Sequence, residues 1–158
     1  MFQVGKIQKA CEGCDGPMSK VTRDFIVKGE YITLIDVEAG IEHFGRGVEK
    51  NIDSVFVVVN PSAESFAIAE KVVKLSKGIG VKKVRAILNK VKSKEIESLM
   101  MNELKKKKVK ILGIVYNDPE VENAGLKGRP LGKCKAKEDV KRIIEILEKY
   151  NELTKKES

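Results

Sequence analysis

Four short runs of apolar, mostly β-branched residues constrain the fold of this chain more than any other feature. They are Tyr31–Ile35, Ser54–Val59, Val84–Leu88 and Ile111–Val115. Each run is nearly continuous in Val, Ile and Leu, which is typical of strands covered on both faces, as in a parallel sheet. Helical patterns separate or follow these runs, and that alternation requires right-handed crossovers. The sequence therefore predicts an α/β fold with a doubly wound, mostly parallel sheet.

The helical patterns have recognisable starts and stops. Ser62 or Asn60 can cap a helix that reaches about Lys77, where Gly78 and Gly80 provide the stop signal. Apolar residues recur at helical spacing in two later segments, namely Ile96, Leu99, Met100 and Leu104, and then Val140, Ile143, Ile144 and Leu147. The predicted order is helix, strand, loop, strand, helix, strand, helix, strand, short helix and long helix.

Length and composition indicate one domain that spans residues 1–158, with residues 151–158 expected to fray. The chain is 42% hydrophobic and 34% charged, and no internal repeat or Pro- or Ser-rich linker divides it. Val55–Val59, the longest apolar run, is far too short to span a bilayer, and the N-terminus lacks the order of a secretion signal. Three cysteines fit a reducing cytoplasm better than a disulfide scaffold.

An acidic, glycine-containing segment, Asp36–Gly47, follows the first predicted strand. A carboxylate after a buried strand suits Mg²⁺, and a glycine such as Gly40 lets the backbone approach a phosphate closely. Asp36, Asn60, Asn89 and Asn117 each follow a predicted strand, so we expect all four at the sheet edge where α/β proteins bind ligands. For Asn60 and Asn117, the preferred interpretation is the simpler one of strand terminator or helix cap.

The amino-acid sequence of this segment resembles that of a known family. D-x-x-A-G-I-E, which begins at Asp36, is similar to the second switch region of MinD/ParA-type P-loop ATPases. The longer E-A-G-I-E-H-F-G-R-G looks like the CooC-type ATPases that assist nickel insertion into carbon monoxide dehydrogenase. A cysteine pair followed by a helix, the dipeptide Asn89-Lys90 and the run Gly125–Leu131 agree with that family, so the resemblance covers essentially the whole chain.

The resemblance implies roles for individual residues. Asp36 would hold the water shell of magnesium as the catalytic carboxylate, and Gly40 would face the γ-phosphate. Asn89, within the Asn89-Lys90 motif, would contact the adenine base. The residues that would move with the switch and report nucleotide state to a partner are Glu38, Glu42, His43 and Arg46. Outside this motif, His43 would be interpreted as a loop histidine and Arg46 as a surface charge.

The phosphate-binding loop of that family has no counterpart in these 158 residues. The segment Gly128-x-x-x-Gly132-Lys133-Cys134 has one spacer too few and a cysteine where magnesium needs a hydroxyl. Without the glycine cradle and its lysine most of the phosphate electrostatics is lost, so we expect no ATP hydrolysis by this chain alone. Tight Mg-ATP binding is expected only when an N-terminal P-loop half is supplied. The chain is then either a piece of a longer or split protein, or a degenerate member of the family. Loss of the family's first strand should also leave an unpaired sheet edge beside Tyr31–Ile35.

Cys11-Glu-Gly-Cys14 is the candidate metal site, just before a helix predicted from Pro17 to about Lys28. Two thiols do not close a structural zinc site, which needs four ligands, whereas a two-fold dimer brings two pairs together. The CooC family places such a pair at its dimer interface, with one intervening residue where this chain has two. Zinc, nickel and an iron–sulfur cluster therefore all stay open. The alternatives are a redox dithiol or two unrelated cysteines.

The expected function is that of a CooC-like accessory protein in nickel-centre maturation. Its expected partners are a second copy of itself and a client metalloenzyme such as a carbon monoxide dehydrogenase-like protein. The alternative is a MinD/ParA-like non-catalytic interaction or DNA-partitioning module, because the net charge of +8 permits an acidic partner. Tryptophan is absent and aromatics are scarce, which argues against base-stacking platforms for single-stranded nucleic acid. Lys105–Lys108 is interpreted as a solvated helix end, the later lysines are scattered, and acidic residues are interleaved in the last helix, so nucleic-acid binding is not the favoured interpretation.

Overall fold

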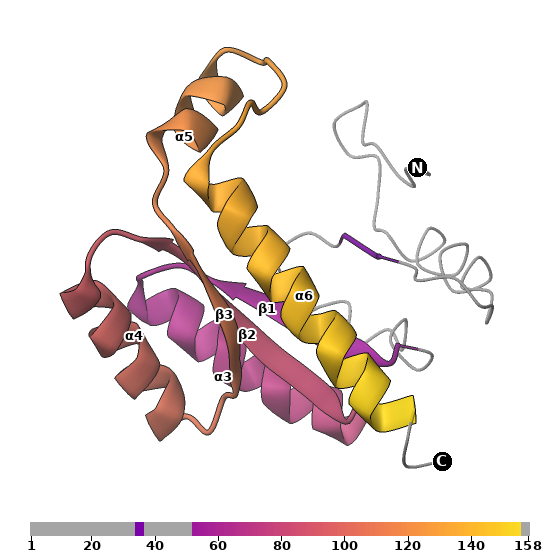
Figure 1. Cartoon of the computed structure of the whole chain (residues 1–158). Coiled ribbons are helices and arrows are strands. Elements are labelled where there is room, and N and C mark those ends of the chain that lie inside the picture. Colours follow the sequence, from indigo (N-terminus) through magenta and orange to yellow (C-terminus); the bar gives the residue numbers. More distant parts are fainter. Residues whose placement is uncertain (1–33, 37–51, 156–158) are drawn as a thin grey trace, which may run out of the picture.

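A computed structural model describes residues 34–36 and 52–155 of the chain (Figure 1). Strands and helices alternate through most of the second range. In chain order they are β1 (Ser54–Val59), α3 (Ala63–Gly78), β2 (Lys83–Val91), α4 (Lys94–Lys106), β3 (Ile111–Tyr116), α5 (Pro119–Leu126) and α6 (Lys135–Lys155). The predicted α/β fold is confirmed, whereas the helix expected from Pro17 to Lys28 lies outside the described residues.

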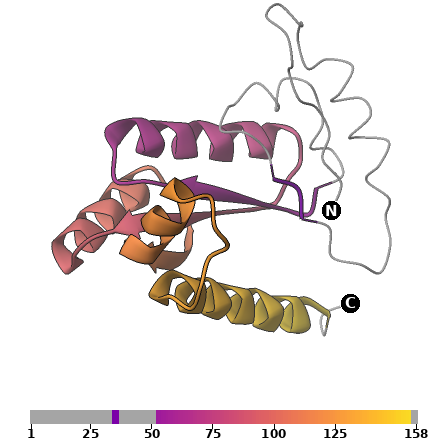
Figure 2. The same ribbon diagram turned by 90° about the horizontal axis from the view of Figure 1, so that it is seen from above.

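The described strands form one parallel sheet in the order β1-β2-β3. Val55 pairs with Val84 and Val59 pairs with Leu88, so β1 and β2 run in register along the whole of β1. Helices α3 and α4 cover one face of the sheet, and α6 lies on the other face against β3 (Figures 1 and 2). Helices on both faces are the expected arrangement for a doubly wound sheet.

Each of the two helices α3 and α4 begins at a side-chain cap. The hydroxyl of Ser62 accepts a hydrogen bond from the backbone N–H of Ser65 at 3.2 Å, so Ser62 rather than Asn60 caps α3. Ser93 caps α4 in the same way, accepting from the N–H of Ile96 at 3.3 Å. These bonds satisfy backbone donors that the first helical turn leaves without partners.

The turns that end α3 and α4 have the same backbone geometry. After α3, Gly80 has a φ of 89° and the N–H of Val81 donates to the carbonyl of Ser76 at 2.9 Å. After α4, Lys108 has a φ of 57° and the N–H of Val109 donates to the carbonyl of Leu104 at 2.9 Å. Both turns use a left-handed residue to reverse the chain into the next strand, as helix C-termini commonly do.

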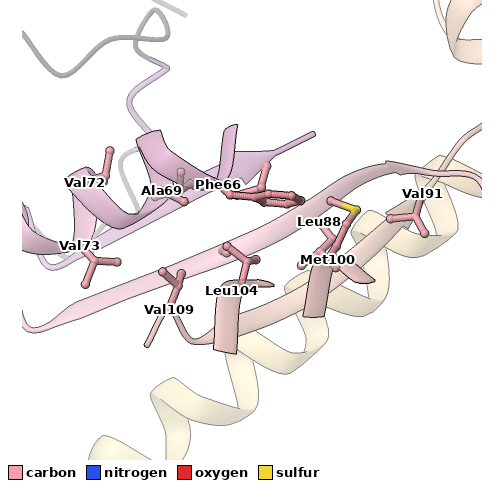
Figure 3. Close-up of a cluster of buried hydrophobic side chains, with 12 residues drawn as sticks. Phe66, Ala69, Val72, Val73, Leu88, Val91, Met100, Leu104 and Val109 are labelled. Atoms are coloured by element: carbon pink, nitrogen blue, oxygen red, sulfur yellow. The ribbon is translucent and has the colours of Figure 1, made fainter. Parts of the chain in front are cut away.

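The main core lies between the sheet and the helices α3 and α4 (Figure 3). Phe66 of α3, Leu88 of β2, and Met100 and Leu104 of α4 point into the same space. Leu88, Met100 and Leu104 are 0% exposed, so the helical pattern of α4 correctly located its buried face. Leu99 of the same pattern is 51% exposed and lies outside the core.

Helix α6 buries a narrower stripe than its pattern predicted. Ile143 is 5% exposed, whereas Val140 and Ile144 are 44% and 49% exposed. In the described part of the chain α6 packs mainly on β3, and one strand offers too little width to cover the whole apolar face of a helix. None of the helices in that part combines the length and the apolar character that a bilayer span requires.

Two of the strand predictions need correction. Leu34 and Ile35, the described end of the predicted strand Tyr31–Ile35, belong to no strand, and Leu34 is 86% exposed. An apolar run forms a strand only where a neighbouring strand hydrogen-bonds its backbone groups. Among the described residues, no strand pairs with Leu34 and Ile35. The third predicted strand extends to Val91, because β3 pairs Tyr116 with Val91 beyond an irregularity in the ladder. Asn89 therefore lies within β2 and not after it.

Candidate functional site

Polar side chains from two strands meet at the carboxyl edge of the sheet. Asn60 directly follows β1, and Asn89 lies near the end of β2. The Nδ2 of Asn89 donates a hydrogen bond to the Oδ1 of Asn60 at 3.1 Å. Asn117 directly follows β3, and its backbone N–H donates to the carbonyl of Val91 at 2.8 Å. The structure therefore joins the Asn60 and Asn89 side chains, while Asn117 contacts β2 through its backbone.

Lys90 has an unusual backbone conformation beside this amide pair. Its φ is 57°, within a strand whose pairing with β3 shifts register between Leu88 and Val91. The left-handed region costs a residue with a side chain roughly 1–2 kcal/mol. Such strain is concentrated at functional sites, where the surrounding structure imposes it. Lys90 is exposed, so its side chain lies at the surface next to Asn89.

Most of the expected switch and metal residues are outside the described part of the chain. Asp36 is described, and it is exposed and belongs to no helix or strand. The residues that lie outside are Cys11, Cys14, Glu38, Gly40, Glu42, His43 and Arg46. Within the described residues, no group of three or more His, Cys, Asp and Glu side chains is arranged to hold a metal ion. The roles assigned to these residues therefore stay predictions.

Sequence reasoning missed a three-membered cluster between α4 and β3. The Nζ of Lys94 lies 2.8 Å from the Oε2 of Glu97 and 2.8 Å from the hydroxyl of Tyr116. That hydroxyl donates in turn to Glu97. The bond from Lys94, then that from Tyr116, lowers the pKa of Glu97, and the same contacts raise the pKa of Lys94. The spacing of Lys94 and Glu97 was visible in the sequence, but Tyr116 joins them only through the tertiary fold.

A second missed feature is the carboxylate of Asp118, which caps two helices. Its Oδ1 accepts from the N–H of Glu120 at the start of α5 at 2.9 Å. Its Oδ2 accepts from the N–H of Ala136 in the first turn of α6 at 3.0 Å. The bond from Ala136, followed by that from Glu120, lowers the pKa of Asp118. The buried Asp139 of α6 accepts from the N–H of Tyr116 at 3.0 Å, so α6 is tied to the end of β3 as well.

The loop between α5 and α6 folds back on α5. The guanidinium of Arg129 contacts both carboxylate oxygens of Glu120, at 2.7 and 2.9 Å. This two-point contact lowers the pKa of Glu120 and raises that of Arg129. The Nζ of Lys137 donates to the carbonyl of Leu131 at 2.6 Å. Paired contacts of this kind fix orientation, so the Gly125–Leu131 run is held near the carboxyl edge of β3.

The described edge is chemically suited to binding. The side-chain amides of Asn60 and Asn89 supply both donors and acceptors, and Lys90 adds a positive charge. Groups of this kind can hydrogen-bond a planar heterocycle at the place where open α/β sheets hold their ligands.

No family model matches the chain. Two proteins of Methanocaldococcus jannaschii, each named an uncharacterised ATP-binding protein, are similar to it. One is 35% identical over 153 residues, covering 94% of this chain and 59% of the relative. The other is 31% identical over 159 residues, covering 98% and 62%. The chain thus spans about three fifths of the length of these relatives.

A third relative and one solved structure extend these likenesses. The carbon monoxide dehydrogenase accessory protein CooC of Rhodospirillum rubrum is 33% identical over 97 residues, which is 59% of this chain and 37% of CooC. A chain in the MinC:MinD cell division protein complex of Aquifex aeolicus superposes with a TM-score of 0.53 at 19% identity, covering 75% of this chain and 51% of that chain. The chain is therefore similar in sequence to ATP-binding proteins and to CooC, and it has a MinD-type α/β fold.

Proposed function

We propose that this chain is a CooC-like accessory protein for the maturation of a metal centre, built on the fold of a MinD/ParA-like nucleotide switch. Support comes from its similarity to CooC, a carbon monoxide dehydrogenase accessory protein, and from its MinD-type fold. The nickel-containing client would be a carbon monoxide dehydrogenase-like enzyme. The Asp36–Gly47 segment would be the switch that reports nucleotide state to that client.

The observation that carries the nucleotide part of the proposal is the amide pair at the carboxyl edge. Because the Nδ2 of Asn89 is held by Asn60, the Oδ1 of Asn89 stays available as an acceptor. An acceptor in that position complements the exocyclic amino group of adenine and opposes the keto oxygen of guanine. Lys90, in its strained conformation, would place its backbone and side chain beside the same base.

Phosphate binding needs a segment that these 158 residues do not contain. Asp36 would hold magnesium through water, and Gly40 would face the γ-phosphate, once a P-loop supplies its glycine cradle and lysine. With the base contacts alone, we propose that ATP binds this chain weakly and is not hydrolysed.

The base site can be tested by titrating the ¹⁵N-labelled chain with Mg-ATP in an NMR experiment that detects weak binding. We expect the side-chain amide signals of Asn60 and Asn89 and the backbone signal of Lys90 to shift, with smaller shifts for Mg-GTP. Asn89→Ala should abolish these shifts. Asn123→Ala, the same change at an exposed position of α5, should preserve them. Shifts that persist in Asn89→Ala, or that occur only elsewhere, would reject the base site.

The metal part of the proposal rests on the donor set of Cys11 and Cys14. Two thiolates from each of two chains make a four-sulfur set, which suits zinc or nickel better than a hard cation. Cys134 is a half-buried free thiol with no second cysteine beside it in the described part of the chain. We therefore propose that the metal lies between the Cys11–Cys14 pairs of a homodimer.

Replacing both Cys11 and Cys14 by serine is expected to abolish stoichiometric metal binding and to weaken the dimer. The physical reason is that serine hydroxyls do not replace thiolates as ligands for a soft or borderline metal. Elemental analysis of freshly purified protein, together with its mass in solution, measures both effects. Cys134→Ser is the matched control and should retain the metal. Unchanged metal content and mass in the double variant would contradict the site.

A further inference from the structure

We infer that the amino edge of the sheet binds the phosphate backbone of double-stranded nucleic acid. Two described segments that run to this edge are rich in lysine: residues 70–83, from the second half of α3 into β2, and residues 103–110, from the end of α4 to the start of β3. Together they contain ten lysines and two glutamates. We call the exposed lysines of these segments the amino-edge surface; they are Lys71, Lys74, Lys77, Lys82, Lys83, Lys105, Lys106, Lys108 and Lys110.

The fold brings the two segments together. In a parallel sheet with helical crossovers, the helices end at the edge where the strands begin, and the ends of α3 and α4 lie on the same side of the molecule (Figure 1). The N–H of Ala86 donates to the carbonyl of Lys110 at 2.7 Å, and Lys107 contacts Glu70 at 2.8 Å. Neighbouring strands are about 5 Å apart and packed helices about 10 Å apart. Lysines on neighbouring segments therefore lie within about one screening length of each other at physiological salt, so their charges add.

Local carboxylates neutralise only a few of these charges. Glu70 contacts Lys74 and Lys107, and Glu103 contacts Lys106. The hydrogen bond from Lys107, followed by that from Lys74, lowers the pKa of Glu70 to about 2. The lysines of the surface that have no ion pair to another described residue are Lys71, Lys77, Lys82, Lys83, Lys105, Lys108 and Lys110. Asp53 directly precedes Ser54, which pairs with Lys83, and therefore adds one negative charge at this edge. Among the described residues the amino edge still carries a large excess of positive charge.

Helix-end electrostatics explains only part of this pattern. Lysines in the last turn of α4 are favoured by the helix dipole, but Lys82, Lys83 and Lys110 lie beyond the helix ends. Lys108 occupies the left-handed position that Gly80 occupies in the equivalent turn after α3. Glycine adopts this conformation without steric cost, whereas lysine does not. The chain thus carries a positive charge at a position where folding alone favours glycine.

The composition of the surface selects the partner. Residues 70–83 and 103–110 contain no aromatic side chain and no arginine, so base stacking and bidentate base contacts are not available. Protein–protein interfaces are enriched in aromatics and arginine and depleted in lysine. Membrane-surface binding needs an apolar face or a lipid anchor beside the charges. Within residues 70–83 and 103–110, Leu75 is the single large apolar side chain exposed by more than a third, so these segments offer no apolar face. Backbone phosphates require only clustered positive charge, independent of base sequence.

The test is fluorescence anisotropy of the full chain with labelled duplex DNA and duplex RNA of one sequence, over a series of salt concentrations. Lys82→Gln, Lys83→Gln and Lys110→Gln are combined in one variant. Removing three phosphate contacts should lower the slope of log affinity against log salt by about 3 and weaken binding at least about tenfold. The control combines Lys127→Gln, Lys133→Gln and Lys141→Gln, exposed positions that carry no ion pair to another described residue. This control should retain the wild-type slope.

Lys108→Gly separates nucleic-acid binding from folding. This variant should unfold at a higher temperature, because glycine relieves the left-handed strain, and yet it should bind duplexes more weakly.

Equal affinity losses in the amino-edge and control variants would overturn the inference, as would a salt slope near zero. Binding to phosphatidylserine vesicles with the same lysine dependence and no duplex binding would also overturn it. A preference for DNA or for RNA supports it and identifies the source of the phosphates. Because the surface lies opposite the carboxyl edge, Asn89→Ala should leave duplex binding unchanged.

Discussion

Replacing Gly113 of β3 by alanine is expected to destabilise the fold by about 1–3 kcal/mol, the usual cost of overpacking a core. A Cβ on Gly113 would overlap the Cγ1 of Ile143 and lie 2.9 Å from its Cδ1. Ile143 is a buried residue of α6, and α6 packs on β3, so neither the strand nor the helix can move away without separating from the other. Chemical denaturation followed by circular dichroism measures the change.

A matched substitution distinguishes this clash from a general effect of alanine. Gly125 lies in α5, and a Cβ added to it would have no atom within 4 Å, so Gly125→Ala should be neutral or should stabilise the chain by up to about 1 kcal/mol. Combining Gly113→Ala with Ile143→Ala should cost less than the sum of the two single changes, because the new methyl group occupies part of the space left by the isoleucine. Strict additivity would show that α6 does not pack on Gly113 as described.

Asp118→Ala is the second substitution with a large expected effect. It removes both acceptors that cap α5 and α6, at 2.9 and 3.0 Å, and leaves two backbone N–H groups without their partners. The loss of two caps should lower the midpoint of thermal unfolding by roughly 5 °C. Asp118→Asn keeps one acceptor oxygen and should have an intermediate midpoint. Asp53→Ala, the same change at an exposed position before β1, should leave the midpoint unchanged.

The effect of Asp118 should also depend on pH. The N–H of Ala136, followed by that of Glu120, holds the pKa of Asp118 below its ordinary value of 3.8. A carboxylate with a lowered folded-state pKa contributes stability that is complete above its unfolded pKa and is lost as the pH falls through its folded pKa. The difference in stability between wild type and Asp118→Asn should therefore be constant near neutrality and shrink below pH 3.8. A difference that grows on acidification would contradict the double cap.

Much of the fold could be predicted from local patterns. Ser54–Val59 was predicted with its observed bounds, and Ser62 was one of two candidates for the cap of α3. These features depend on short-range chemistry, namely β-branched apolar runs and side chains that bond to the backbone a few residues away. The parallel sheet followed from the same information, because alternating strands and helices leave few other arrangements.

The candidate site was predictable only in outline. That Asn60 and Asn89 lie near one sheet edge follows from their place at the ends of apolar runs. Their hydrogen bond depends on the register of β1 against β2, which pairs Val59 with Leu88. The left-handed Lys90 depends on a register shift against β3, and no local signal in the sequence marks it.

By itself, the sequence determined which segments are strands and helices from Ser54 onward, narrowed the cap of α3 to Asn60 or Ser62, and located part of the core, such as Met100 and Leu104. Only the tertiary structure decided that Leu34 and Ile35 are in no strand, that Asn89 is inside β2, and that Asp118 joins two helices. The physical reason is the sequence distance over which each kind of interaction acts. Propensity and capping act over a few residues, whereas ladder register and side-chain pairing depend on segments tens of residues apart that meet only in the folded chain.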